Sequence, residues 1–200
     1  MKRLYGYIAV LGVTLATCTS CRGTFSKEDK ALIFADPQEL MHVLVVDDPK
    51  ENEVLRTPSG IMSRRALKSE AYRLLVQRMS VTVQDSTVGG VGIAGPQVGI
   101  NKRLVVVQRF DKVNAEAEAP FIAYPNIRIV SYGDARQTGP EGCLSVPGRS
   151  EQVSRAEQIV ISYTDPATLK EVRETVEGYT AVIFQHEVDH LEGIIYTDRL

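Results

Sequence analysis

Short apolar runs rich in β-branched residues occupy much of the second half of the chain. Four of them, bounded by turn residues, have the length and composition of strands: residues 104–108, 127–132, 158–163 and 172–176. Between the last two lies Asp165-Pro166-Ala167-Thr168, a sequence typical of a hairpin turn. The pattern therefore predicts antiparallel strands with short connections.

Two other segments show helical periodicity. In residues 63–83, apolar side chains recur at steps of three and four residues, and Ser63 is a plausible N-cap. These side chains are Leu67, Ala71, Leu74, Leu75 and Met79. Residues 179–192 are apolar on nearly every side, so this second helix should be buried, and Gly193 should end it.

The remaining segments read as loops. Residues 49–60 are rich in turn residues, residues 89–99 contain too much glycine for regular structure, and residues 111–120 resemble a surface excursion. Phe121, Tyr124 and Tyr179 are expected in the core. We find no internal repeat and no second domain in the pattern.

These elements predict an α+β fold, with antiparallel sheets packed around the buried helix of residues 179–192. A chain of 200 residues, 44% apolar and 24% charged, suits one globular domain. The net charge of −2 gives no general attraction to nucleic acid, so we expect no nucleic-acid partner.

The N-terminal residues differ in composition from the rest of the chain. Lys2 and Arg3 precede an apolar run over residues 4–16, which is typical of a secretory signal and too short for a typical membrane span. Cysteines at the end of this run, Cys18 and Cys21, resemble the lipidated cysteine of bacterial lipoprotein signals. Which of the two would be modified stays open.

This pattern divides the chain into a leader (1–21), a polar tether (22–30) and a catalytic domain (31–200). It predicts a location at the cell envelope, exported or anchored to the membrane by lipid. The alternatives are an N-terminal helix that is never cleaved, a wrongly assigned start, and a cytoplasmic protein. Without the leader, Cys143 is the only cysteine, which excludes a disulfide framework.

The chemistry is concentrated in the segment His186-Glu187-Val188-Asp189-His190. Histidines four residues apart share one face of a helix and can bind one divalent cation, while the intervening Glu187 can act on water. A third ligand is needed. Only Glu192 and Asp198 follow as carboxylates, so Cys143 is the best candidate on ligand chemistry.

Three segments resemble the motifs of peptide deformylase, in the family's order: residues 90–97, 141–145 and 185–190. The resemblance extends over residues 40–200. It implies hydrolytic removal of the formyl group from N-formylmethionyl peptides by a monomer. It also implies one divalent metal ion per chain, with Fe²⁺ expected first and Ni²⁺ or Zn²⁺ as alternatives.

By this resemblance, Cys143, His186 and His190 are the metal ligands. Glu187 would be the general base for the attacking hydroxide, and the Gln97 amide and Leu144 N–H would stabilise the oxyanion. The residues expected to contact the peptide are Gly90, Gly92, Ile93 and Gly142. Those expected to orient the imidazoles are Glu141 and Asp189, with Arg155 as a partner for Glu141.

Two other functions remain open at this point. A membrane-anchored zinc endopeptidase would need a third ligand after His190. A peptide-binding module that keeps the fold without turnover would not need Glu187 as a base. His42 has no evident partner and is not assigned to the site.

Overall fold

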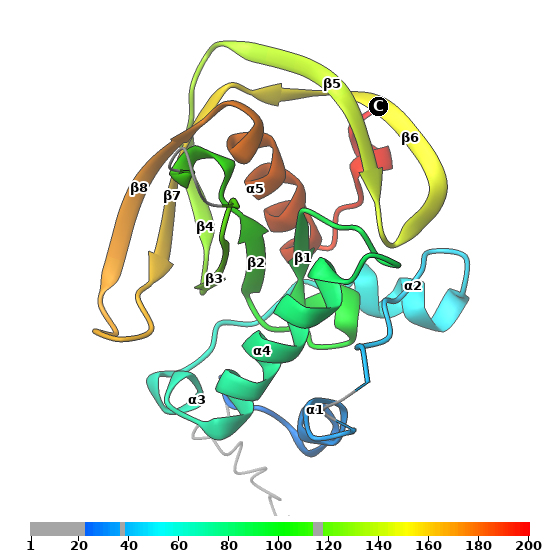
Figure 1. The fold of residues 1–200 in the computed structure, drawn as a ribbon, viewed down its shortest axis with the longest axis vertical. Helices are drawn as coiled ribbons and strands as arrows, with labels where there is room; N and C mark the ends of the chain where they lie inside the picture. Colours follow the sequence, from blue (N-terminus) through cyan, green and yellow to red (C-terminus); the bar gives the residue numbers. More distant parts are fainter. Residues whose placement is uncertain (1–22, 37–38, 114–117) are drawn as a thin grey trace, which may run out of the picture.

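The computed structural model describes residues 23–36, 39–113 and 118–200, and these residues form three antiparallel sheets (Figure 1). The strand orders are β1-β2-β3, β4-β7-β8 and β5-β6. The strands are β1 (Gly92–Ala94), β2 (Leu104–Gln108), β3 (Phe121–Pro125), β4 (Arg128–Tyr132), β5 (Arg136–Cys143), β6 (Val146–Ala156), β7 (Gln158–Thr164) and β8 (Glu171–Glu177). The predicted leader, with Cys18 and Cys21, lies outside the described residues.

Helices complete the α+β fold that the sequence predicted. The α-helices are α1 (Lys27–Ile33), α2 (Pro49–Leu55), α3 (Arg64–Leu67), α4 (Glu70–Gln84) and α5 (Gly178–Leu191). Short 3₁₀ helices are η2 (Gly95–Val98), η3 (Phe110–Lys112) and η4 (Tyr196–Arg199). Within the described part of the chain, no helix combines the length and apolar composition needed to cross a bilayer.

Helix α5 contacts strands of all three sheets, and the strands surround it in Figure 1. Its apolar side chains Ala181, Phe184, Val188 and Leu191 are buried in a cluster with residues of β2 and β7. Full burial of one such aliphatic or aromatic side chain contributes roughly 1.5–3 kcal/mol. Packing therefore holds this helix in place, although it also carries several polar side chains.

The four strands predicted from the sequence are present as β2, β4, β7 and β8: β2 has the predicted bounds, and the other three differ by one residue at one or both ends. The turn between β7 and β8 also forms as predicted. The Asp165 carboxylate accepts hydrogen bonds from the backbone N–H groups of Ala167 (3.0 Å) and Thr168 (2.6 Å), which closes the turn.

The strands that the sequence analysis missed are β1, β3, β5 and β6. Strand β1 lies within the segment that we considered too rich in glycine, and its pairing with β2 stabilises it there. Strands β5 and β6 pair only with each other and leave many of their residues exposed, so they lack the apolar alternation that marks a half-buried strand.

Capping residues explain the differences in the helices. The single helix predicted over residues 63–83 is two helices, because Ser69 caps the start of α4 just as Ser63 caps α3. The turn-rich segment after Asp48 contains α2, with Asp48 as N-cap and Pro49 in the first turn. In both segments the cap signals were more informative than the overall composition.

The polar segment expected to be a tether is partly folded against the domain. Ser26 and Asp29 form a capping box at the start of α1. Phe25 and Ile33 are buried in the same cluster as residues of α4. The predicted boundary between tether and domain at residue 30 therefore falls inside a packed helix.

A buried arginine joins β2, β8 and η3. Arg109 is fully buried and donates hydrogen bonds to the Asp111 carboxylate, to both oxygens of Glu174 and to the Tyr124 hydroxyl. The hydrogen bond from Arg109 lowers the pKa of Asp111. Burial raises the pKa of Glu174, but the hydrogen bonds from Arg109 and Lys112 outweigh it, so that pKa is also lowered.

Arg109→Met should lower the free energy of unfolding by about 3 kcal/mol at pH 7, because two carboxylates lose a buried partner. Both have lowered pKa values in the folded state, so the stability they contribute is present above about pH 4.5 and is lost as the pH falls through their folded values. The difference between variant and wild type should therefore shrink below pH 4.5. Urea unfolding from pH 3 to 8 measures this, with the exposed Arg128→Met as control.

Candidate functional site

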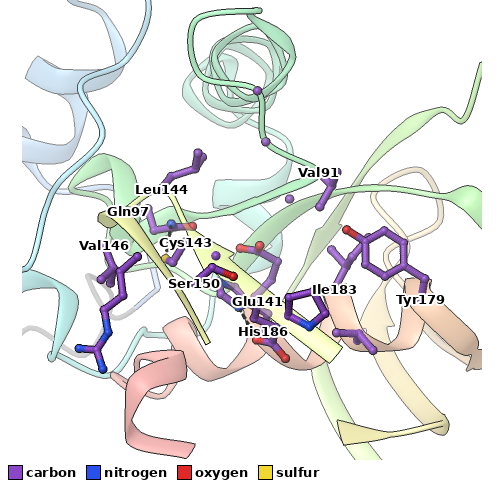
Figure 2. Close-up of a pocket in the computed structure, with 18 of the residues that line it drawn as sticks. Val91, Gln97, Glu141, Cys143, Leu144, Val146, Ser150, Tyr179, Ile183 and His186 are labelled. Atoms are coloured by element: carbon purple, nitrogen blue, oxygen red, sulfur yellow. Dashed lines mark hydrogen bonds and ion pairs between the residues drawn. The ribbon is translucent and has the colours of Figure 1, made fainter. Parts of the chain in front are cut away.

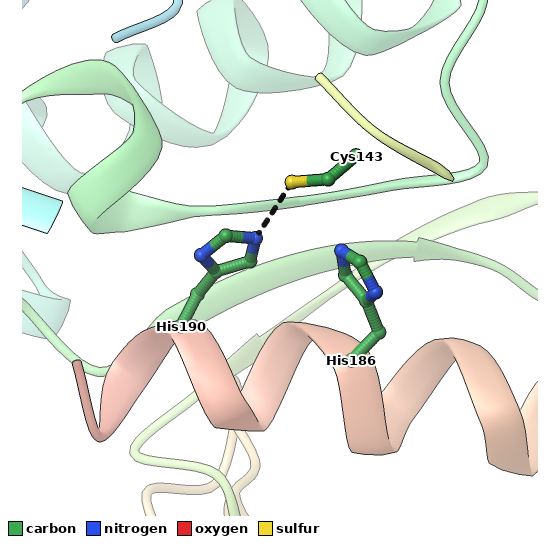
Figure 3. Close-up of side chains that lie close together, drawn as sticks. All are labelled: Cys143, His186 and His190. Atoms are coloured by element: carbon green, nitrogen blue, oxygen red, sulfur yellow. Dashed lines mark hydrogen bonds between the residues drawn. The ribbon is translucent and has the colours of Figure 1, made fainter. Parts of the chain in front are cut away.

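Helix α5 directs His186 and His190 toward the end of β5, where Cys143 lies (Figure 3). The Cys143 Sγ atom is 3.2 Å from His190 Nε2, and one ligand atom from each of the three residues lies within 4.8 Å of the others. Ligand atoms around a tetrahedral metal ion are roughly 3.3–3.6 Å apart. The fold thus brings together the three residues expected as ligands, from segments more than 40 positions apart.

A buried carboxylate holds His186. The His186 Nδ1 atom is 2.8 Å from Glu141 Oε2, and Arg155 donates to both oxygens of Glu141 at 2.7 and 3.0 Å. Burial raises the pKa of Glu141, but the hydrogen bonds from His186 and Arg155 outweigh it and lower that pKa to about 2. Burial lowers the pKa of His186, but the hydrogen bonds with Cys143 and Glu141 outweigh it and raise that pKa to about 10. The anionic carboxylate keeps a proton on Nδ1, so a cation would replace the proton at Nε2.

Asp189 lies in the same network but not against an imidazole. Its hydrogen bonds come from Arg155 (2.6 Å) and from Arg199 (2.5 and 3.1 Å). The expectation that Asp189 orients a histidine ring is therefore corrected: its contacts orient Arg155. Arg199 was not predicted to belong to this network, since nothing in the local sequence connects residue 199 to it.

His190 has no such carboxylate partner. Its Nδ1 atom is buried without a hydrogen-bond partner among the described residues. Burial lowers the pKa of His190 well below its ordinary value, so the imidazole is neutral and its lone pair is available to a metal ion. Neutral imidazole beside a thiol is a donor set that suits iron, nickel and zinc.

Glu187 lies beside the ligands and is 4% exposed. Its Oε2 atom is buried with no hydrogen-bond partner among the described residues, and burial raises the pKa of this carboxyl to about 7. A carboxyl group that titrates near neutral pH can both accept and release a proton. This side chain therefore has the properties of an acid–base group.

Two glycines of the segment before η2 leave space for this chemistry. A Cβ atom at Gly92 would lie 2.5 Å from Glu187 Oε1 and 2.9 Å from its Cγ. A Cβ atom at Gly90 would lie 2.8 Å from Val83 Cγ2 and 3.1 Å from Leu144 Cδ1. Gly92 thus permits the close approach of β1 to the buried carboxyl group.

The Gln97 side chain is held in one orientation. Its Oε1 atom accepts a hydrogen bond from the Ala94 N–H at 2.9 Å, so its Nε2 group points to the opposite side. There Nε2 lies 3.2 Å from Ser145 Oγ and 3.7 Å from Cys143 Sγ. An N–H donor is therefore fixed beside Cys143, one of the three candidate ligands.

A pocket of about 520 Å³ opens over these groups, and Figure 2 shows side chains that line it. Gly90, Gly92 and Gly142, expected to contact the peptide, line it, and so does Leu144. Ile93 does not, because its side chain is fully buried in the core. Val91 takes that place.

One further side chain of the lining was misjudged from the sequence. Tyr179 is 55% exposed at the pocket and in contact with Phe110, whereas we expected it in the core with Tyr124, which is buried there. Tyr179 lies at the start of α5, where the helix emerges from the core. A helix that reads as apolar on all sides gave no sign of this exposed end.

The carboxylates after His190 are engaged elsewhere. Glu192 forms an ion pair with Arg103 at 2.8 Å, and Asp198 pairs with Arg56. Neither belongs to the cluster of possible metal ligands found among the described residues. This arrangement contradicts the endopeptidase alternative, which needed a third ligand in that segment.

Comparison with known sequences gives one family. The polypeptide deformylase profile matches residues 41–200. A peptide deformylase from Roseiflexus castenholzii is 34% identical over 170 residues, covering 80% of this chain and 89% of its own length. A peptide deformylase from Desulforudis audaxviator is 36% identical over 149 residues, covering 74% of this chain and 92% of its own length.

Solved structures agree with this comparison. The class I type b peptide deformylase from Acinetobacter baumannii, crystallised with Met-Ala-Ser bound, is 31% identical with a TM-score of 0.71, over 81% of this chain and 99% of that one. Peptide deformylase from Thermotoga maritima is 30% identical with a TM-score of 0.68, over 82% of this chain and 99% of that one.

Gly92→Ala should reduce turnover by about 10²-fold, because the added Cβ atom displaces the Glu187 carboxyl group and a shift of about 1 Å can cost that much. Metal content, measured by atomic emission, should stay at the wild-type level. Gly139→Ala in β5 is the control, since its Cβ atom would meet nothing within 4 Å. A normal rate in Gly92→Ala would contradict the packing described here.

Proposed function

The chain belongs to the peptide deformylase family, and on this premise we propose how its residues remove the formyl group from N-formylmethionyl peptides. The observation that carries the proposal is the cluster of Cys143, His186 and His190 beside the buried carboxyl group of Glu187. No neighbouring group among the described residues satisfies Glu187 Oε2, which leaves it available to water or substrate.

The thiolate of Cys143 and the Nε2 atoms of His186 and His190 would hold one divalent cation. When bound, the cation supplies Lewis acidity toward the formyl carbonyl and toward water. We propose Fe²⁺ as the native ion, while Ni²⁺ and Zn²⁺ fit the same donors. Glu141, fixed by Arg155, keeps the His186 ring in the tautomer that this role needs.

Glu187 is the proposed general base. Its carboxyl group takes a proton from the attacking water molecule and delivers it to the departing amine of methionine. The pKa of about 7 suits both transfers at neutral pH. Burial maintains this pKa, so the packing that excludes solvent from Glu187 also determines the pH at which its carboxyl group exchanges a proton.

Gln97 and Leu144 are the proposed donors to the oxyanion that develops on the formyl oxygen. The Gln97 amide is already fixed by Ala94, so it needs no reorganisation during the reaction. Leu144 follows Cys143 directly, and its backbone N–H is therefore close to the ligand sulfur. Removing one such donor costs about 10²–10³ in rate in other hydrolases.

The peptide itself is proposed to bind along β1. This strand pairs with β2 on one edge only, and the other edge can accept an extended peptide. Gly90, Val91 and Gly92 on one side and Gly142 and Leu144 on the other line the space for it. Of the residues expected in this role, Ile93 would contribute through its backbone alone.

We further propose that the protein acts as a monomer at the cell envelope. The three candidate ligands, Glu187 and Gln97 converge within one chain, and this convergence supports the monomer. The basis for the location is the signal-like sequence before Arg22, with lipidation at Cys18 or Cys21. Formyl peptides at the envelope, rather than chains emerging from the ribosome, would then be the substrate.

Glu187→Ala should retain the metal but lower kcat for formyl-Met-Ala-Ser by about 10²–10⁴, because the general base is lost. Release of formate in anaerobic buffer with Fe²⁺ is the measurement, alongside an unformylated peptide with internal bonds. Cys143→Ala is the comparison and should lose metal instead. If Glu187→Ala turned over at the wild-type rate, the proposed mechanism would be wrong.

Radiolabelled palmitate should be incorporated into the protein in growing cells. Substitution of the modified cysteine, by Cys18→Ser or by Cys21→Ser, should abolish the label. The measurement is autoradiography together with mass spectrometry of the N-terminus. An unlabelled protein with an intact Met1 would contradict the proposed lipid anchor. It would leave the deformylase activity unaffected.

A further inference from the structure

The charges that line the pocket are unevenly distributed. Within the described residues of the lining, Arg149 is the one lysine or arginine, and the carboxylates are Glu141 and Glu187. Glu141 is engaged by Arg155 and His186, and Glu187 is almost fully buried. Arg149 is therefore the charge that a ligand in the outer part of the pocket would meet.

The backbone of Arg149 is fixed relative to the metal ligands. The Tyr196 hydroxyl, on a buried side chain, donates to the Arg149 carbonyl at 3.1 Å. Arg149 immediately precedes Ser150, which pairs with Gly142, the residue before Cys143. The guanidinium is thus attached to a well-held part of β6, although its side chain is 51% exposed.

The guanidinium itself is only partly engaged. Its Nε atom donates to Glu151 Oε1 at 3.0 Å, and we find no partner for either terminal nitrogen among the described residues. An arginine in this state can bind a carboxylate through its terminal nitrogens. Glu151, two residues along the same strand, competes for the same positive charge.

The proposed function sets the direction of the peptide. The formyl group must lie at Cys143 and Glu187 in the buried part of the site, so the carboxyl-terminal part of the peptide extends outward. An extended tripeptide spans roughly 10–11 Å. The pocket volume of about 520 Å³ is within the range of sites that enclose small ligands.

We propose that Arg149 binds a carboxylate at the outer end of the formyl peptide, so that short free peptides are favoured over capped or longer ones. This inference rests on the proposed function of the site. The carboxylate can be the peptide's own C-terminus or an acidic side chain at the third residue. A nascent chain attached to its transfer RNA has no free C-terminal carboxylate, so the preference would favour released peptides.

The test compares kcat/KM for formyl-Met-Ala-Ser with that for its C-terminal amide. Wild type should prefer the free acid by about two- to fivefold, the range expected for an exposed ion pair. The difference should lie in KM, because the carboxylate is remote from the formyl group. The preference should also decrease as ionic strength rises.

Two variants should shift this ratio in opposite directions. Arg149→Gln should bring it close to one, whereas Glu151→Gln should raise it, because the competing carboxylate is gone. Arg173→Gln is the matched control: Arg173 also donates from Nε to a glutamate two residues away, Glu171, but does not line the pocket. The acid and the amide are compared on the same sample of each variant, so partial loss of folded protein lowers both rates equally and leaves their ratio unchanged.

Formyl-Met-Ala-Asp amide distinguishes the two sources of the carboxylate. If wild type hydrolyses this peptide as fast as formyl-Met-Ala-Ser with a free C-terminus, an acidic side chain can also bind Arg149. If the rate equals that of formyl-Met-Ala-Ser amide, Arg149 requires the terminal carboxylate. Equal kcat/KM for acid and amide in wild type, or an unchanged ratio in Arg149→Gln, would overturn the proposal. If no formyl peptide were hydrolysed, the proposed function itself would fail.

Discussion

The site depends most on the buried ion pair between Glu141 and Arg155. The pair links β5 to β6, and Arg155 also bonds Asp189 on α5, so three elements meet at one guanidinium. Removing one member of a buried pair costs about 3–5 kcal/mol, because the other charge stays unpaired. Since Glu141 also bonds His186, the interaction that joins these elements also orients a candidate metal ligand.

Two carboxyl groups in one pocket have opposite ionisation behaviour for a clear physical reason. Glu141 receives hydrogen bonds from Arg155 and His186, which lower its pKa to about 2. Glu187 is buried beside glycine backbone with no donor for Oε2 among the described residues, and its pKa rises to about 7. The permanent anion holds the His186 ring, whereas the carboxyl group that can exchange protons suits acid–base chemistry.

Much of the fold could be predicted where one face of an element is buried. Strands β2, β4, β7 and β8 and helix α5 have strong apolar patterns, and the sequence located them. Strands β5 and β6 could not be located in this way, because their pairing with each other stabilises them and many of their residues stay in solvent. Yet β5 carries Cys143, one of the candidate metal ligands, and Glu141, the carboxylate that orients another.

The spacing of His186, Glu187 and His190 on one helix is a local property, and the sequence alone determined it. The sequence also indicated Cys143 as the best candidate for the third metal ligand, because thiolate is a suitable donor. Only the tertiary structure decided that this sulfur meets those rings, that Asp189 holds Arg155 rather than an imidazole, and that Val91 replaces Ile93 in the pocket. Such contacts join segments distant in the chain, and their geometry follows from packing, which no local pattern encodes.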